Sequence, residues 1–121
     1  MGLEPVDRNA PSLWNAVGER WHGWGGASDS LWSQALKALL DPREMASGAA
    51  HVQQRLRQEP RYACRVARLR AELPVESPLR ETGDEADLVL AGQALAAFVA
   101  TLHSPRSPFD RFRDALLRGD R

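Results

Sequence analysis

Apolar residues recur at helical spacing along most of the chain after residue 29, and no segment shows the alternation typical of a strand. The strongest pattern covers 85–103 and predicts a helix with one face on a core. Its apolar stripe consists of Leu88, Ala91, Leu95, Phe98 and Leu102. Weaker patterns predict helices over 30–40, 48–58 and 60–73. We therefore expect an all-α fold of about five helices.

Short polar residues and prolines mark where these helices begin and end. Asp29 or Ser28 is expected to cap the first helix and Ser47 the second, since short polar side chains accept hydrogen bonds from free first-turn amides. The Asp41-Pro42 pair should end the first helix. Pro60 should open the third helix. Residues 74–83, with two prolines and a glycine, are expected to form a loop.

A last helix is predicted to follow the two prolines at 105 and 108. Ser107 is suited to its cap, with Pro108 at the first helical position and Gly119 at its end. Its apolar face would consist of Phe109, Phe112 and Leu116. This pattern completes the set of five helices.

Residues 1–28 contain prolines and glycines but no helical period, and we expect them to be irregular. All four tryptophans nevertheless lie between positions 14 and 32. A loop with that much aromatic surface must pack on something. The chain is therefore expected to be all-α with an irregular Trp/Gly-rich N-terminal segment.

The 121 residues suffice for one small domain, 1–121, with a thin core. Sixteen basic residues balance sixteen acidic ones, so net charge provides no attraction to nucleic acid or to an anionic membrane. No apolar run is long enough to span a membrane, and the first residues do not form a signal peptide. The single cysteine, Cys64, is expected to be a buried structural thiol.

Two further groups of residues have competing interpretations. The three histidines, His22, His51 and His103, lack metal-ligand spacing, although His22 could touch a haem supplied in trans. Arg61, Arg65 and Arg68 share one helical face. That face is either a docking patch for an acidic partner or nucleic acid, or a solvated face balanced by nearby glutamates.

Three segments, in order and at similar spacing, resemble the di-haem cytochrome c peroxidases and the related MauG-type enzymes. They are Arg8–Asn15, Trp24–Gln34 with Glu44-Met45 ten residues later, and Ala94–Leu102 running into Ser107–Phe112 and Gly119-Asp120. Together they cover nearly the whole chain. The resemblance implies the segment that lies between the two haem-attachment motifs of such an enzyme.

The resemblance also implies roles for four residues. Asn9 matches an asparagine that helps to hold a calcium ion, and Trp24 matches a tryptophan on the electron path between the haems. Gln34 and Glu44 match the catalytic polar pair on the peroxide side of one haem. A carboxylate can move the proton that peroxide cleavage needs, while an amide can orient the peroxide. Gly25 and Ala27 depart from the family, which usually has Asp and Arg there.

Both Cys-x-x-Cys-His motifs for covalent haem are absent, because the chain has one cysteine. The family implies haem c, calcium, a small cytochrome or cupredoxin as electron donor, and a periplasmic location, and it allows a homodimer of the full-length protein. The isolated chain is expected to be an inactive partial domain. The alternatives are a haemless helical interaction module and a degraded gene remnant without enzymatic function.

Overall fold

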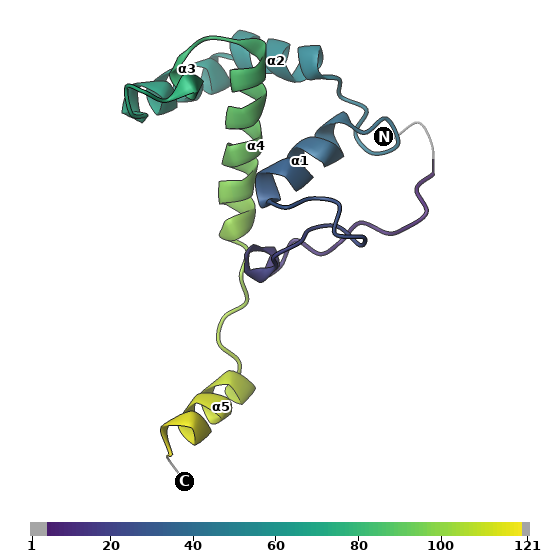
Figure 1. The fold of residues 1–121 in the computed structure, drawn as a ribbon, viewed down its shortest axis with the longest axis vertical. Coiled ribbons are helices and arrows are strands. Elements are labelled where there is room, and N and C mark those ends of the chain that lie inside the picture. The colour runs from purple at the N-terminus through teal and green to yellow at the C-terminus, as the bar shows by residue number, and fades with distance from the viewer. Residues whose placement is uncertain (1–4, 120–121) are drawn as a thin grey trace.

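The computed structural model describes residues 5–119 and confirms an all-α fold, with no strand among these residues. Figure 1 shows one long helix at the centre of the molecule, with shorter helices packed beside it and the last helix of the chain lying apart. The helices are α1 (Leu31–Leu40), α2 (Ala49–Gln58), α3 (Pro60–Glu72), α4 (Asp84–Ala100) and α5 (Pro108–Arg118), with short 3-10 turns η1 (Ala16–Gly18) and η2 (Pro78–Arg80). None of the described helices is long and apolar enough to cross a membrane.

The central contact of the fold is the packing of α1 against α4 (Figure 1). It forms around Gly92, which is buried in α4. A Cβ atom at Gly92 would lie 2.9 Å from Leu36 Cγ and 3.1 Å from the backbone oxygen of Trp32. The missing side chain thus lets the two helix backbones approach closely.

The α2–α3 pair lies across the N-terminal end of α4 (Figure 1) and is held there by an ion network. Asp87 of α4 is only 2% exposed. Its carboxylate accepts from Arg57 Nε at 2.8 Å and from Arg70 Nη2 at 2.5 Å. Arg57 also reaches Asp84 at 2.8 Å. The hydrogen bonds from Arg57 to Asp87 and then Asp84 raise the pKa of Arg57.

Most predicted helix ends are confirmed, and two predicted caps are wrong. Pro60 opens α3, and Ser107 and Gly119 bound α5. The cap of α1 is Ser30, whose hydroxyl accepts from Ser33 N, rather than Asp29 or Ser28. The cap of α2 is Gly48, with a φ of 22° and no side-chain cap, rather than Ser47.

The predicted core face of α4 is partly wrong. α4 buries Leu90, Gly92 and Val99, whereas Leu95 is 38% and Phe98 60% exposed. The reason is that α4 is apolar on several sides, so the approach of α1 at Gly92 decides which side is covered. The prediction for Cys64 is also wrong, because its position on α3 is exposed.

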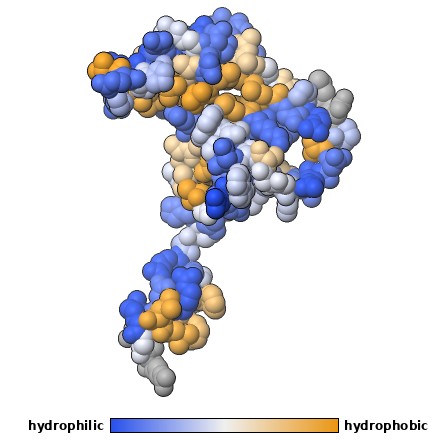
Figure 2. Space-filling view, viewed as in Figure 1, coloured by the Kyte–Doolittle hydropathy of each residue, from blue (hydrophilic) through white to orange (hydrophobic). Residues whose placement is uncertain are grey.

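Helix α5 extends away from the other helices at the end of an extended segment (Figure 1). Its start is a capping box, in which Ser107 and Asp110 exchange hydrogen bonds. The predicted apolar face exists but is exposed, and Figure 2 shows hydrophobic surface on α5. Phe109, Phe112 and Leu116 are 68%, 59% and 56% exposed.

The whole chain has an accessible surface of 9364 Å². A compact monomer of the same mass, 13.4 kDa, would have about 6,500 Å². The excess arises where large apolar side chains of α5 and of the N-terminal segment are open to solvent. The buried apolar side chains of the small core come from η1, α2 and α4, and many other large apolar side chains within residues 5–119 are exposed.

Candidate functional site

Trp24 and Asn9, the predicted electron-path and calcium residues, lie together. The indole Nε1 of Trp24 donates to the backbone oxygen of Asn9 at 2.5 Å. This bond joins the first and second of the three sequence segments that resemble the peroxidases. It fixes one edge of the indole while the side chain as a whole stays 64% exposed.

A tight turn explains why Trp24 projects from the surface. His22 and Ser28 are both buried and pair through two backbone hydrogen bonds, of 2.8 and 3.2 Å. Between them, Gly26 N donates to Gly23 O at 3.0 Å, so that Trp24 and Gly25 form the tip. Gly23 and Gly26 have φ values of 77° and 64°, which side chains rarely adopt.

Gln34, a predicted catalytic residue, lies near the start of α1 and faces this turn. Its Oε1 atom is buried and has no hydrogen-bond partner among the described residues. The same atom lies 3.2 Å from where a Cβ of Gly23 would stand. A buried acceptor without a partner costs about 1–3 kcal/mol, so this oxygen is suited to a donor that the chain itself does not supply.

Glu44, the other predicted catalytic residue, is exposed in the turn that follows α1. Asp41 ends that helix, and its carboxylate accepts from Arg43 Nη2 at 2.8 Å, which lowers the pKa of Asp41 to about 2. Met45 N and Ser47 N then donate back to Ala38 O and Leu39 O. The turn is thereby folded onto the end of α1.

The structure does not bring Gln34 and Glu44 together. Gln34 lies in the first turn of α1, whereas Glu44 lies in the turn that follows Leu40 and folds back through the bond from Met45 N to Ala38 O. The structure gives no hydrogen bond between them.

Asn15 is a positioning residue that the sequence analysis did not single out. Its backbone N donates to Leu102 O at 2.9 Å, and its side chain exchanges hydrogen bonds with Ser104 at 2.9 and 3.1 Å. It has a left-handed φ of 62°. These bonds tie the N-terminal segment to the end of α4. The sequence signal for Asn15 was its position at the end of the first segment that resembles the peroxidases.

Several large apolar side chains of the N-terminal segment are exposed. Trp14, Trp21 and Trp24 are 60%, 56% and 64% exposed, and Leu13 and Val17 are more than half exposed. Large exposed apolar surfaces usually mark a binding site for a cofactor or another protein surface. Within residues 5–119 there is no group of three or more His, Cys, Asp or Glu side chains suited to a metal ion.

Comparison with known proteins identifies one family and two relatives. The family model described as di-haem cytochrome c peroxidase matches residues 1–120. The methylamine utilization protein MauG of Methylorubrum extorquens is 32% identical over 111 residues, which cover 92% of this chain and 29% of that protein. The cytochrome c551 peroxidase of Pseudomonas aeruginosa is 31% identical over 119 residues, covering 98% of this chain and 31% of that protein.

No solved structure matches the chain. The chain spans about a third of the length of the curated relatives that it matches. The family match nevertheless extends over nearly all of its residues, including the Asn9–Trp24 pair and both ends of α1. The last residue of the third resembling segment, Asp120, lies outside the described residues. On this evidence the chain belongs to the di-haem cytochrome c peroxidase family.

Proposed function

We propose that this chain supplies the inter-haem segment of an enzyme that reduces hydrogen peroxide with electrons from a small redox protein. The observation that carries the proposal is the uncovered aromatic surface around Trp24, within a chain that exposes 9364 Å² where a compact protein of its mass would expose about 6,500 Å². A surface of this kind needs a cover, and haem-bearing parts of the same enzyme would provide it. Residues 1–121 would then be a partial domain.

The residues present are suited to lining a haem, but not to attaching one covalently. Two thioether bonds need two cysteines, and the chain has only Cys64, which is exposed on α3. The exposed indoles of Trp14 and Trp24 are suited to contact with a macrocycle, whereas the guanidinium group of Arg20 lies over the ring of Trp21. When bound, haem supplies the redox chemistry of peroxide reduction. Its attachment would depend on cysteines outside these residues, and the chain alone would be inactive.

Trp24 and Asn9 would act together between the two haems. The hydrogen bond to Asn9 O holds the indole in one orientation, which keeps the aromatic ring at a fixed place on the electron path. The Asn9 side chain would provide one of the roughly six or more oxygen ligands that a calcium ion needs. A calcium ion there would stabilise the backbone on which Trp24 depends.

Glu44 and Gln34 would handle the peroxide. A carboxylate such as that of Glu44 can take the proton from the near oxygen of the peroxide and deliver it to the far oxygen, which leaves as water. The unpartnered Oε1 of Gln34 would accept a hydrogen bond from the peroxide or from a water that holds it. Gln34 lies in the first turn of α1 and Glu44 in the turn that follows this helix, so the peroxide would lie along one side of α1.

A second function is favoured by the same exposed surface together with α5. The apolar face of α5, with Phe112 59% exposed, could bind a partner helix in a haemless interaction module. The proposed peroxidase would act in the periplasm, an expectation that rests on the family resemblance. The interaction module requires neither haem nor export, so the two functions differ in cofactor dependence.

Adding ferric haem to the purified chain separates these functions. We expect a Soret band that saturates at one haem per chain, and Trp24→Ala should weaken binding more than Trp32→Ala, which alters a less exposed tryptophan. Acid–acetone extraction should remove all the haem, because no thioether bonds form. A spectrum of free haem alone would contradict a haem-lining role for the exposed tryptophans and favour the interaction module.

A further inference from the structure

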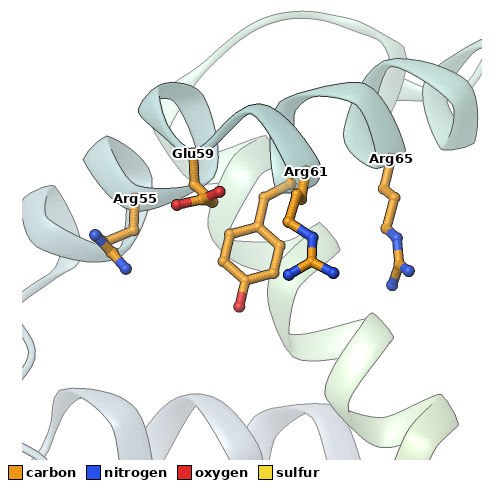
Figure 3. A pocket seen from close by; sticks show the side chains of 5 residues that line it. Arg55, Glu59, Arg61 and Arg65 are labelled. Atoms are coloured by element: carbon orange, nitrogen blue, oxygen red, sulfur yellow. The ribbon is translucent and has the colours of Figure 1, made fainter.

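A hollow of about 380 Å³ opens where α2 ends and α3 begins, and Trp24 is not among its lining residues. Arginines dominate its walls. Figure 3 shows the side chains of Arg55, Arg61 and Arg65 projecting to one side of the two helices, with Glu59 beside Arg55. Tyr62, which is 48% exposed, completes the lining.

The arginines of α2 and α3 divide into two groups that the sequence could not separate. Arg57 and Arg70 bind Asp87, and Arg68 pairs with Glu72 at 3.0 Å. In contrast, no ion pair within residues 5–119 involves Arg55, Arg61 or Arg65. The hollow therefore gathers the cations of this region that remain uncompensated, three arginines against one glutamate.

We propose that this hollow is a docking surface for an acidic segment of a partner protein. Guanidinium groups bind carboxylates through paired hydrogen bonds, and three of them on one side can engage successive acidic side chains. Tyrosine and arginine are also the residues that most often anchor protein interfaces. Charge complementarity thus identifies the occupant as a carboxylate-rich peptide surface.

Other occupants fit the hollow less well. Small-molecule sites are usually enclosed and mainly apolar, whereas this hollow is open and lined mostly by charged side chains. Nucleic acid needs a basic surface supported by net positive charge, and this chain has a net charge of zero. The proposal does not depend on haem, so it and the peroxidase function can fail separately.

The test is fluorescence anisotropy with a labelled peptide in which glutamates alternate with alanines, measured on the 121-residue chain. The peptide should bind at low salt and more weakly at physiological salt. The double charge reversal Arg61→Glu with Arg65→Glu should weaken binding by roughly tenfold or more. The matched control, Arg68→Glu, alters an arginine of the same helix outside the hollow and should bind within about twofold of the unaltered chain.

Several results would overturn the proposal. One is the absence of peptide binding, and another is an equal loss in the Arg68→Glu control. A DNA oligonucleotide of the same charge that binds as tightly would show a general polyanion surface, while citrate binding without peptide binding would show a small-anion site. If the chain self-associates and the double charge reversal abolishes this, the occupant of the hollow is a second copy of the chain and not a partner protein. Circular dichroism checks that each variant is folded. If the double charge reversal unfolds the chain, the milder double variant Arg61→Ala with Arg65→Ala takes its place.

Discussion

The helical core and the aromatic surface of this protein differ in whether their side chains find partners within the chain. In the core, α1 meets α4 at Gly92, and Asp87 finds both Arg57 and Arg70 within the chain. In the N-terminal segment and α5, backbone geometry is just as well defined, but the large side chains face solvent. The comparison teaches that local order and burial are separate properties. A segment with a defined backbone conformation and exposed apolar side chains is suited to binding a cofactor or another protein surface.

The largest expected difference between the two regions comes from paired truncations. Leu90→Ala removes a side chain that is 5% exposed and should lower the free energy of unfolding by about 2–4 kcal/mol. Phe112→Ala removes a larger side chain that is 59% exposed and should change it by less than about 0.5 kcal/mol. Urea unfolding measures both. Equal losses would mean that α5 packs on the core in solution.

Removing the buried carboxylate should have the next largest effect. Asp87→Ala leaves Arg70, whose side chain is 15% exposed, without its counter-charge, and Arg57 is solvated enough to adapt. We expect a loss of about 2–3 kcal/mol in urea unfolding. Glu72→Ala, which breaks the exposed pair with Arg68, serves as control and should cost less than about 0.5 kcal/mol. An Asp87→Ala loss as small as the control's would refute the network.

A smaller effect is expected where the helix backbones cross. Gly92→Ala adds a methyl group that collides with Leu36 and with the backbone of Trp32. Overpacking costs about 1–3 kcal/mol, of which better helix propensity returns about 1 kcal/mol. We expect a net loss of about 1 kcal/mol by thermal or urea unfolding. Gly18→Ala, with no atom near the new Cβ, should lack this packing penalty.

The smallest effect concerns pH and the start of α5. The hydrogen bond from the Ser107 hydroxyl is the main cause of the lowered pKa of Asp110. Because the folded-state pKa lies below the unfolded one, the capping contribution is present above about pH 4 and is lost as pH falls through the lowered value. NMR shifts of α5 amides should report this loss. Asp110→Asn should remove that transition, and an unchanged transition would assign it elsewhere.

Much of the fold was predictable because its signals are local. Pro60 and Gly119 mark helix ends through the backbone conformations that they favour, and Ser107 does so through a capping hydrogen bond to Asp110 N. The Asp87 network was missed because its partners lie 17 and 30 residues away, and the arginines were treated as one basic stretch. The exposed Phe98 was missed because α4 offers apolar residues on several sides.

The candidate site was predictable only through the family resemblance. Asn9 and Trp24 look like ordinary turn and core residues by themselves, and their hydrogen bond runs through a backbone oxygen that no side-chain pattern reveals. The position of Trp24 at the tip of the turn follows from the positive φ values of Gly23 and Gly26. From the sequence, these glycines indicate only that the backbone is flexible there. The assignment of Glu44 and Gln34 as catalytic residues stays a prediction.

A segment exchange tests the central claim, that this chain supplies the peroxide-side and inter-haem residues. Residues 1–120 would replace the matching stretch of the Pseudomonas aeruginosa cytochrome c551 peroxidase, with haem content equalised. The exchanged enzyme should reduce peroxide, and Glu44→Gln should lower its kcat by about 10²–10⁴-fold, while Glu72→Gln leaves kcat unchanged. An inactive exchanged enzyme with full haem, or a Glu44→Gln variant as fast as its parent, would contradict the account.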